Sequence, residues 1–396
     1  MKILQVNNVY GEKSTGKITK ILHEGLKAAG YESVVVFGRG KGTQEANVIR
    51  LCPELYTKFN ALRARVTGIP YGGCFLSTAR LKRIISREKP DVVHLQCING
   101  YFVNIYEIVR WLKEKGIRTV VGLHAEFMYT ANCGHAFECT QWEHGCRKCP
   151  NPRKAVKSWF FDRAGHSWRK MQKAFAGFED NCVIVPVSPW TEERAKRGDI
   201  LKGFNFCTIY PGVDSNLFRW DDEESKKRNT VFHATAHFSV EKDHGKGGWY
   251  LAELARRMPD VTFLVAGRTD PAEKLPENLV LLGEVRDQYK LSELYRQAAV
   301  SVLVSRRETF SMVCAESLCC GTPVVGFMAG GPERIALKEY SEFVEQRDLD
   351  GLEASVRRWL NSEYDPQQVA VEAKEVYSEA CMINRFLKLY GEMTSC

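Results

Sequence analysis

Short apolar runs alternate with amphipathic stretches along the first half of the chain. Runs rich in β-branched residues predict strands at residues 2–6, 33–37, 92–95 and 118–123. Between them, apolar residues recur at helical spacing and predict helices at residues 17–29, 78–89 and 106–115. Gly30 and Gly116 follow two of these helices as stop signals. Strands that alternate with helices in this way predict a parallel, doubly wound α/β sheet.

The second half repeats this alternation. Strands are predicted at residues 230–233, 261–266, 280–282, 300–304 and 322–326, and helices at 248–258, 291–298 and 311–320. A Pro-Gly pair and a polar stretch within residues 211–228 separate the halves. We therefore expect two Rossmann-like domains that face each other across a cleft, with ligands at the carboxyl ends of the strands. The expected boundaries are 1–212 with a Cys-rich insertion at 130–152, 213–378, and a C-terminal helix at 379–396 packing on the first domain.

The bulk composition is that of a soluble globular protein, with 44% hydrophobic and 26% charged residues in 396. No apolar stretch approaches the roughly 20 residues needed to span a bilayer. The N-terminal apolar run is interrupted by Asn7 and Asn8, and no small-residue cleavage pattern follows it. These features predict a cytoplasmic protein.

The net charge of +8 is unevenly distributed. Residues 1–215 carry 33 basic against 19 acidic side chains, whereas the remainder carries 23 against 29. A basic first half suggests an anionic neighbour, such as a membrane surface, a phosphorylated acceptor or nucleic acid. In the first case, the expectation is peripheral association of the basic N-terminal domain with the inner face of a membrane. An uneven scatter of solvated charges is the simpler alternative. Nucleic acid is the least favoured partner, because the basic residues form no dense run and no aromatic stacking motif accompanies them.

The strongest chemical signal is a pair of glutamates, Glu308 and Glu316, with seven residues between them. The segment follows a strand and enters a helix for which Ser311 is a suitable N-cap. The first amides of that helix, with its partial positive charge, would favour a diphosphate. Glu308 could then reach a sugar hydroxyl, and Glu316 could accept hydrogen bonds from a ribose diol. The spacing alone is also compatible with two unrelated glutamates.

The surrounding residues resemble the large retaining glycosyltransferase family that has the GT-B fold and is numbered four. That family carries the same glutamate pair, then a Gly-x-Pro-Val strand and a Gly-Gly loop, here Gly321–Val325 and Gly330-Gly331. Other segments that resemble family signatures are Ile209–Asp214 with Phe218, Lys246-Gly247, Val265–Gly267 and Gly283–Val285. The resemblance covers most of the chain.

The resemblance implies a role for each matched residue. Lys246 would neutralise the donor diphosphate, Glu308 would hold the donor sugar, and Glu316 would bind the ribose. The segment Phe310, Ser311, Met312 and Val313 would line the diphosphate, and Val285 would cover the base. His124, at the end of a first-domain strand, would face the sugar, and Gly16 would let the backbone approach the donor or acceptor.

One position departs from the family. An arginine usually lies five residues before the lysine, but Glu241 occupies that position here. Arg268, just past a strand end, is a candidate substitute.

The implied reaction is transfer of a sugar from a nucleotide sugar, a UDP- or GDP-sugar, with retention of configuration. The acceptor would be a saccharide or a polyprenyl-diphosphate-linked sugar, in capsule, exopolysaccharide or O-antigen synthesis. A lysine and a helix N-terminus stabilise the leaving diphosphate without a catalytic metal. A double displacement of the glycosidase type needs two carboxylates about 5 Å apart, and Glu308 is the one good candidate. The formal metal motif of Asp348 and Asp350 is better explained as a helix cap.

Four cysteines, Cys133, Cys139, Cys146 and Cys149, lie within seventeen residues. Four thiols in one excursion suit a structural Zn²⁺ site, although the spacing is not that of a standard zinc ribbon. Reduced, packed thiols and disulfides stay open as alternatives. Similar Cys-rich insertions in polysaccharide-synthesising relatives place this loop beside the acceptor. Trp142 could stack on a sugar or close the core of the loop.

Two other functions compete with transfer. Residues 11–17 nearly fit a phosphate-binding P-loop, but the next residue is Ile18 instead of the Ser or Thr that holds Mg²⁺. A non-catalytic, zinc-bearing scaffold of transferase fold is the second alternative, and Glu241 in place of a cation gives it some support.

Overall fold

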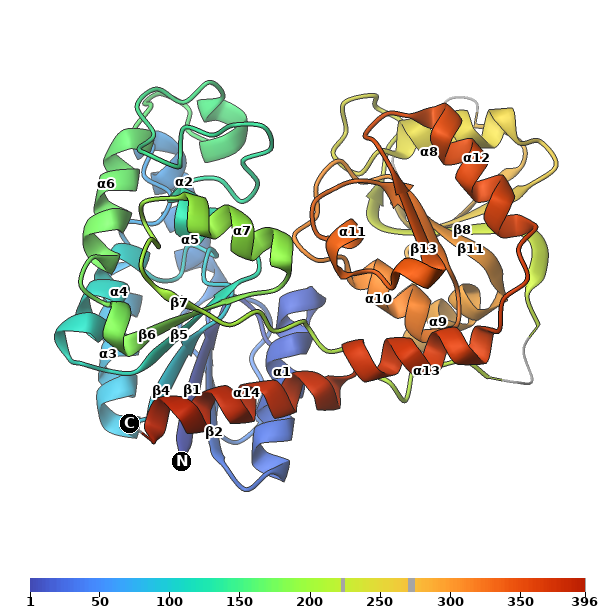
Figure 1. Ribbon diagram of the computed structural model, residues 1–396. Helices are drawn as coiled ribbons and strands as arrows, with labels where there is room; N and C mark the ends of the chain where they lie inside the picture. Colours follow the sequence, from blue (N-terminus) through green and yellow to red (C-terminus); the bar gives the residue numbers. More distant parts are fainter. Residues whose placement is uncertain (222–224, 270–274, 396) are drawn as a thin grey trace. The chain divides into compact units, whose positions relative to one another are not determined.

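The computed structural model describes residues 1–221, 225–269 and 275–395. Part of the polar stretch expected at the domain boundary, residues 222–224, therefore lies outside the described residues. The chain folds into two compact units (Figure 1). Unit 1 contains Met1–Tyr210 and Met382–Cys396, and unit 2 contains Pro211–Cys381.

Unit 1 is built on a seven-stranded sheet in the order β3-β2-β1-β4-β5-β6-β7. All of its strand pairs are parallel. The strands are β1 (Lys2–Asn7), β2 (Glu32–Phe37), β3 (Val48–Arg50), β4 (Val92–Leu95), β5 (Thr119–Leu123), β6 (Cys182–Pro186) and β7 (Asn205–Phe206). The helices are α1 (Lys13–Ala28), α2 (Glu54–Thr67), α3 (Phe75–Glu88), α4 (Ile105–Glu114), α5 (Phe127–Thr130), α6 (Ala164–Phe175), α7 (Pro189–Arg197) and the last helix, α14 (Glu379–Thr394).

Helices cover both faces of this sheet. Successive strand residues point to opposite sides, so each strand contributes side chains to two cores. Leu4 and Val93 face a core formed with α3, α4 and α6. Ile3 and Val92 face a second core formed with α1 and α14. The strands are therefore apolar on both sides, as expected for a parallel sheet.

Helix α14 returns from the end of the chain to the sheet of unit 1. Phe386, Leu389 and Tyr390 are buried in the core that this helix shares with α1. The Tyr390 hydroxyl lies 2.7 Å from Nδ1 of His94, which is fully buried on β4. Gly25 of α1 lies so close to Ile383 that a larger residue there would overlap the isoleucine side chain.

Unit 2 has a six-stranded parallel sheet in the order β10-β9-β8-β11-β12-β13. The strands are β8 (Lys227–Phe238), β9 (Thr262–Thr269), β10 (Leu279–Gly283), β11 (Ala298–Leu303), β12 (Val324–Phe327) and β13 (Ser341–Val344). The helices are α8 (Gly248–Arg257), α9 (Gln288–Gln297), α10 (Met312–Cys319), α11 (Pro332–Ile335), α12 (Leu349–Leu360) and α13 (Pro366–Tyr377). Helices α8 and α12 pack on one face of the sheet. Asp348 caps α12 by accepting a hydrogen bond from the Gly351 amide, as the sequence predicts.

The expected strands and helices are present, with shifted ends. Helix α1 begins at Lys13, four residues before its predicted start, and β8 extends to Phe238. The sequence did not predict α2, β3, α5, α6, β6, α7 or β7 in unit 1, nor α11, β13 or α13 in unit 2. In the described part of the chain, no helix is both long enough and apolar enough to cross a membrane.

Two buried histidines make the stability of the fold depend on pH. Burial lowers the pKa of His94 to about 3 and that of His233 on β8 to about 4, against about 6.5 in an unfolded chain. As the pH falls below 6.5, the unfolded chain binds protons that the folded chain cannot. We expect each histidine to lower the free energy of unfolding by about 2 kcal/mol between pH 7.5 and pH 5.

Denaturant titrations at the two pH values measure this loss. His233→Gln keeps a donor for the Val302 carbonyl, which Nδ1 of His233 contacts at 2.8 Å, and should reduce the pH dependence whatever its stability at pH 7.5. An unchanged dependence would contradict the assignment.

Candidate active site

The carboxyl ends of β8 and β11 mark a switch in the topology of unit 2. From β8 the chain moves outward through β9 and β10, and from β11 it moves outward in the other direction through β12 and β13. The connections that follow β8 and β11 therefore leave the sheet in opposite directions. Sheets of this kind bind their ligands in the crevice between two such connections. Lys246 lies in the first loop and Glu308 in the second.

The structure brings these two predicted residues into direct contact. Nζ of Lys246 lies 2.6 Å from Oε1 of Glu308, although 62 residues separate them. The lysine side chain is 37% exposed and the glutamate side chain 25% exposed. The pair is therefore accessible to a ligand without being fully solvated.

Gly247 fixes the position of the lysine loop. Its φ is +71°, and a Cβ atom here would overlap the carbonyl oxygen of Val304. The Arg306 amide also donates to the Gly245 carbonyl at 2.9 Å, which ties the two loops together. Glycine is required because the backbone is left-handed and packs against the neighbouring loop.

A second loop, at residues 329–331, supports Glu308 from the other side. The Glu308 amide donates to the Ala329 carbonyl at 3.0 Å, and the Gly331 amide donates to the Glu308 carbonyl at 2.9 Å. The Glu333 carboxylate accepts from the amides of Ala329 and Gly330, at 2.9 and 2.7 Å. Sequence reasoning gave Glu333 no role, although a carboxylate two residues after the Gly330-Gly331 pair is placed to bind the amides of that loop.

Helix α10 begins at Met312, four residues after Glu308, at the same edge of the sheet. Oγ of Ser311 accepts a hydrogen bond from the Cys314 amide at 3.3 Å, so the predicted N-cap is present. The φ of Ser311 is +96°, a strained conformation for a residue with a side chain and one found mainly at functional sites. Met312 and Val313 are partly exposed in the first turn. The amides of a first turn have no partner within their helix and suit an anion.

Glu316 lies one turn further along α10. Its Oε2 accepts a hydrogen bond from the hydroxyl of Tyr295 at 3.2 Å. Burial, with the nearby Glu316 charge, raises the pKa of Tyr295 well above its usual range, so the hydroxyl stays a donor. The tyrosine therefore orients the carboxylate, a partnership that the sequence did not reveal.

The remaining predicted donor-binding residues differ in their surroundings. Phe310 is buried and packs edge-on against Tyr377, so its side chain supports the loop. Val285 is partly exposed after β10, and Arg268 is exposed on β9 beside His237. Glu241, in the position of the family arginine, is exposed.

The predicted residues of unit 1 lie at the carboxyl edge of its sheet. Nε2 of His124, after β5, lies 2.7 Å from Oε1 of Gln96, and burial lowers the pKa of His124 to about 4. The imidazole is therefore neutral near pH 7. The Gly16 carbonyl accepts from the Gly11 amide at 2.9 Å, and a Cβ on Gly16 would lie 3.0 Å from the Val9 side chain. The close neighbour of this glycine is the loop after β1.

Two family models match the chain. The model for Glycosyltransferase Family 4 matches residues 16–217, and the model for Glycosyl transferases group 1 matches residues 249–362. The chain belongs to glycosyltransferase family 4. The second match includes Glu308 and Glu316, and it begins three residues after Lys246.

Two similar curated relatives of this family 4 glycosyltransferase act on carbohydrates by name. The colanic acid biosynthesis glycosyl transferase WcaC of Escherichia coli, itself a putative assignment, is 24% identical over 373 residues, 88% of each chain. A GDP-mannose-dependent phosphatidylinositol dimannoside mannosyltransferase of Mycobacterium tuberculosis is 23% identical over 82% of this chain and 79% of its own.

Solved structures of the same fold match the whole chain. Sucrose-phosphate synthase of Thermosynechococcus elongatus has a TM-score of 0.71 at 15% identity, covering 100% of this chain and 99% of its own. HepE of Anabaena, solved with UDP, has a TM-score of 0.65 at 14% identity over 99% and 100%. WaaG, a lipopolysaccharide glycosyltransferase, has a TM-score of 0.60 at 14% identity over the full length of both chains. These matches confirm the expected GT-B fold with two Rossmann-like sheets.

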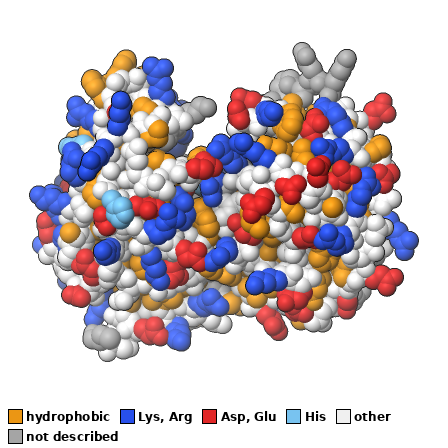
Figure 2. Space-filling model, turned by 45° about the horizontal axis from the view of Figure 1, so that its top comes forward, with side chains coloured by type: hydrophobic (Ala, Val, Ile, Leu, Met, Phe, Trp, Pro, Cys, Tyr) orange, Lys and Arg blue, Asp and Glu red, His pale blue; other side chains and the backbone are white. Residues whose placement is uncertain are grey.

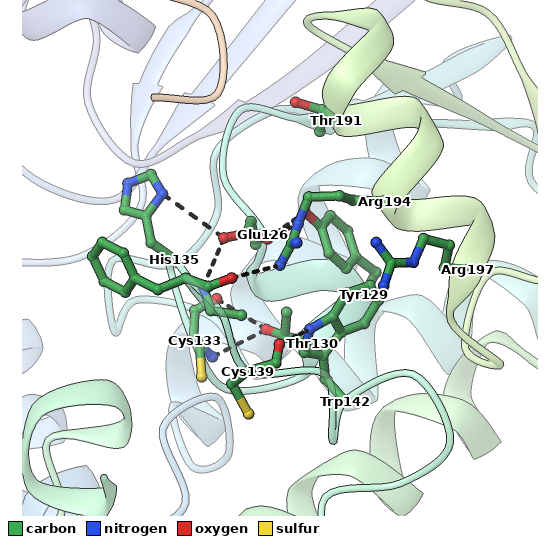
Figure 3. Close-up of polar contacts among 12 residues, drawn as sticks. Glu126, Tyr129, Thr130, Cys133, His135, Cys139, Trp142, Thr191, Arg194 and Arg197 are labelled. Carbon is green, nitrogen blue, oxygen red and sulfur yellow. Dashed lines mark hydrogen bonds and ion pairs between the residues drawn. The ribbon is translucent and has the colours of Figure 1, made fainter. Parts of the chain in front are cut away.

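A buried ion pair anchors the Cys-rich loop of this glycosyltransferase. Oε1 of Glu126 accepts from Nε of Arg194 at 2.7 Å and from the Tyr129 hydroxyl at 2.8 Å, and Oε2 accepts from the Ala136 amide at 2.6 Å (Figure 3). The Arg194 guanidinium also lies 5.2 Å from the Trp142 ring centroid. Trp142 is 1% exposed, so it closes the core of the loop and does not stack on a sugar.

The four cysteines of the loop lie close enough for their charges to interact. None of the described cysteines forms a disulfide. Burial raises the pKa of Cys133, and the charges of Cys149, Cys146 and Cys139 would raise it further. Among the described residues, no three His, Cys, Asp or Glu side chains are arranged to hold a metal. Zinc binding by the four thiols stays a prediction that rests on the donor set and its proximity.

Elemental analysis of the purified protein tests the zinc prediction. We expect about one Zn²⁺ per chain, because four thiols match the usual donor set of a structural zinc. The double variant Cys146→Ser, Cys149→Ser should lose the metal, whereas Cys207→Ser, a partly buried cysteine outside the loop, should keep it. Metal-free wild-type protein with titratable loop thiols would support simple packed cysteines.

Proposed function

We propose that this family 4 enzyme transfers a sugar from a nucleotide-diphosphate sugar to a saccharide or lipid-linked acceptor, with retention of configuration, in polysaccharide assembly. The observation that carries the proposal is the meeting of Lys246, Glu308 and the amino end of α10 at the switch point of unit 2. The relative in colanic acid biosynthesis and the UDP-bound structure of HepE support the substrate class.

The chemistry follows from where charge develops during transfer. Negative charge accumulates on the departing diphosphate, and the Lys246 ammonium with the amides of α10 would stabilise it electrostatically. Positive charge accumulates on the sugar ring, for which the Glu308 carboxylate is the nearby anion. Lys246 would then be shared between Glu308 and the diphosphate, so donor binding replaces part of an existing ion pair. Glu316, oriented by Tyr295, would accept the ribose hydroxyls.

The segment at residues 11–17 gives little support to a P-loop NTPase. Helix α1 begins at Lys13, and the Gly11 amide already donates to the Gly16 carbonyl. A phosphate-binding loop needs its amides directed at the ligand. The non-catalytic scaffold is distinguished by the turnover measurements below.

Donor binding is the first test. A UDP- or GDP-sugar at 100 times its dissociation constant should stabilise the protein by about 2.7 kcal/mol, a rise of several degrees in Tm. Lys246→Ala and Glu316→Ala should each lose most of the shift, because they remove a diphosphate and a ribose contact. Lys242→Ala is the matched control, since this exposed lysine lies in the same loop but over the Trp249 ring. Site variants that respond like the wild type would refute the assignment.

Turnover and stereochemistry are the second test. With an α-configured donor and a panel of saccharide and polyprenyl-diphosphate-sugar acceptors, the anomeric proton coupling of the product should indicate an α-linkage. Glu308→Gln should lower kcat by about 10² to 10³, the typical cost of removing one preorganised electrostatic contact. Glu241→Gln should leave kcat within a few-fold. A β-linked product would contradict retention, and complete inactivity towards donor and acceptors would favour the scaffold.

A further inference from the structure

Helix α2 in unit 1 exposes its apolar side. Leu55, Phe59, Leu62 and Val66 are 78%, 65%, 48% and 38% exposed. Spacings of four, three and four residues place them on one stripe of the helix. The residues that α2 buries against the protein are Thr57, Asn60 and Ala64. This arrangement inverts the usual surface helix, whose apolar stripe faces the core.

Other exposed apolar residues adjoin the carboxyl end of α2. Trp159, Phe160 and Phe161 are 48%, 70% and 51% exposed. They are attached to the helix because the Trp159 amide donates to the Arg65 carbonyl at 2.8 Å. After the turn that follows α2, Phe75 and Leu76 begin α3 at 69% and 76% exposure. We call these nine residues the apolar patch. Exposed large apolar side chains that gather on one part of a surface are typical of an interaction site.

Basic side chains border the apolar patch. Lys58 and Arg65 lie on one flank of the α2 stripe, and the Arg65 guanidinium is 5.8 Å from the Trp159 ring. The Arg163 guanidinium is 5.5 Å from the ring of Phe161. Figure 2 shows apolar and basic side chains together at the top of the left-hand lobe, which is unit 1. The border is therefore suited to an anionic partner.

A cavity beside Phe75 adds to this positive charge. Its volume is about 440 Å³, and its lining includes Arg63, Arg110, Lys170 and Lys173. The one acidic side chain in the lining, Glu107, is paired with Nζ of Lys82 at 2.6 Å. Near the patch, Glu54 is likewise paired with Arg39, and Asp162 accepts from the Cys149 amide. Arg110 is also paired, with Glu114 at 3.5 Å. The lining nevertheless carries four cations against one carboxylate.

We propose that the apolar patch inserts into the interfacial layer of an anionic lipid bilayer, with α2 lying parallel to the membrane plane. The evidence is the combination of an outward apolar stripe, three consecutive aromatic residues and a basic border, which matches the chemistry of a headgroup layer above acyl chains. The apolar area alone would be enough to bind a protein partner, so a protein contact would not explain the surrounding cations. Docking would keep unit 1 at the surface where a lipid-linked acceptor is found. The membrane assignment itself does not depend on the identity of the donor.

Vesicle co-sedimentation tests the proposal. Wild-type protein should bind vesicles of phosphatidylcholine with 30% phosphatidylglycerol and bind pure phosphatidylcholine at least tenfold more weakly. The double variant Phe59→Ser, Leu62→Ser should lose at least tenfold in partition coefficient on the anionic vesicles. Lys58→Glu with Arg65→Glu should lose a similar factor at low salt. The control Val371→Ser removes a 46% exposed apolar residue of unit 2 and should bind like the wild type.

Two further measurements keep the outcomes distinct. Circular dichroism and the nucleotide-sugar Tm shift should be unchanged in the Phe59→Ser, Leu62→Ser variant, because these side chains are exposed and lie outside the donor site. A wild type that ignores anionic vesicles, or a variant that binds them equally well, overturns the proposal. A wild-type dimer that the double variant converts to monomer, without vesicle binding, assigns the patch to a protein contact instead.

Discussion

The contact between Lys246 and Glu308 is the interaction on which the proposed chemistry depends. It forms because parallel strands β8 and β11 are neighbours in the sheet while their connections leave in opposite directions. The two loops can then approach each other without a covering helix between them. A cation and an anion held together at this edge, next to a helix amino end, supply opposite charges within one small region. Transfer from a diphosphate donor needs both charges.

Backbone constraints hold this arrangement, and they are independent of the charges themselves. Gly247 permits a close backbone approach, Ser311 occupies a strained left-handed conformation, and Glu333 binds the amides of the glycine loop. Strain of this kind persists only where surrounding contacts impose it. The pattern indicates a site organised before ligand binding, in which little reorganisation is required when charge develops.

The distinctive features of unit 1 are a buried ion pair beneath the Cys-rich loop and an exposed apolar surface. The carboxylate of Glu126 pairs with Arg194 and accepts from the Ala136 amide, and these buried contacts hold the Cys-rich loop against unit 1. Helix α2, by contrast, exposes its apolar side chains to solvent, which is unfavourable unless another surface covers them. The proposed donor site therefore lies in unit 2, and the proposed membrane contact lies in unit 1.

The sequence by itself determined the two alternating α/β halves, because buried parallel strands read as β-branched runs and the helices between them keep a 3.6-residue period. It also determined the residues around 308–316, where a cap, two glutamates and a glycine loop are local in the chain. Helix α2 was not predicted, although its apolar residues recur at helical spacing. That this apolar stripe faces outward, while Thr57, Asn60 and Ala64 are buried, was decided by packing and is not encoded in the spacing. Only the tertiary structure joined Lys246 to Glu308, Tyr295 to Glu316 and Glu126 to Arg194. Contacts between residues distant in the chain are set by strand order and packing, and no local pattern encodes them.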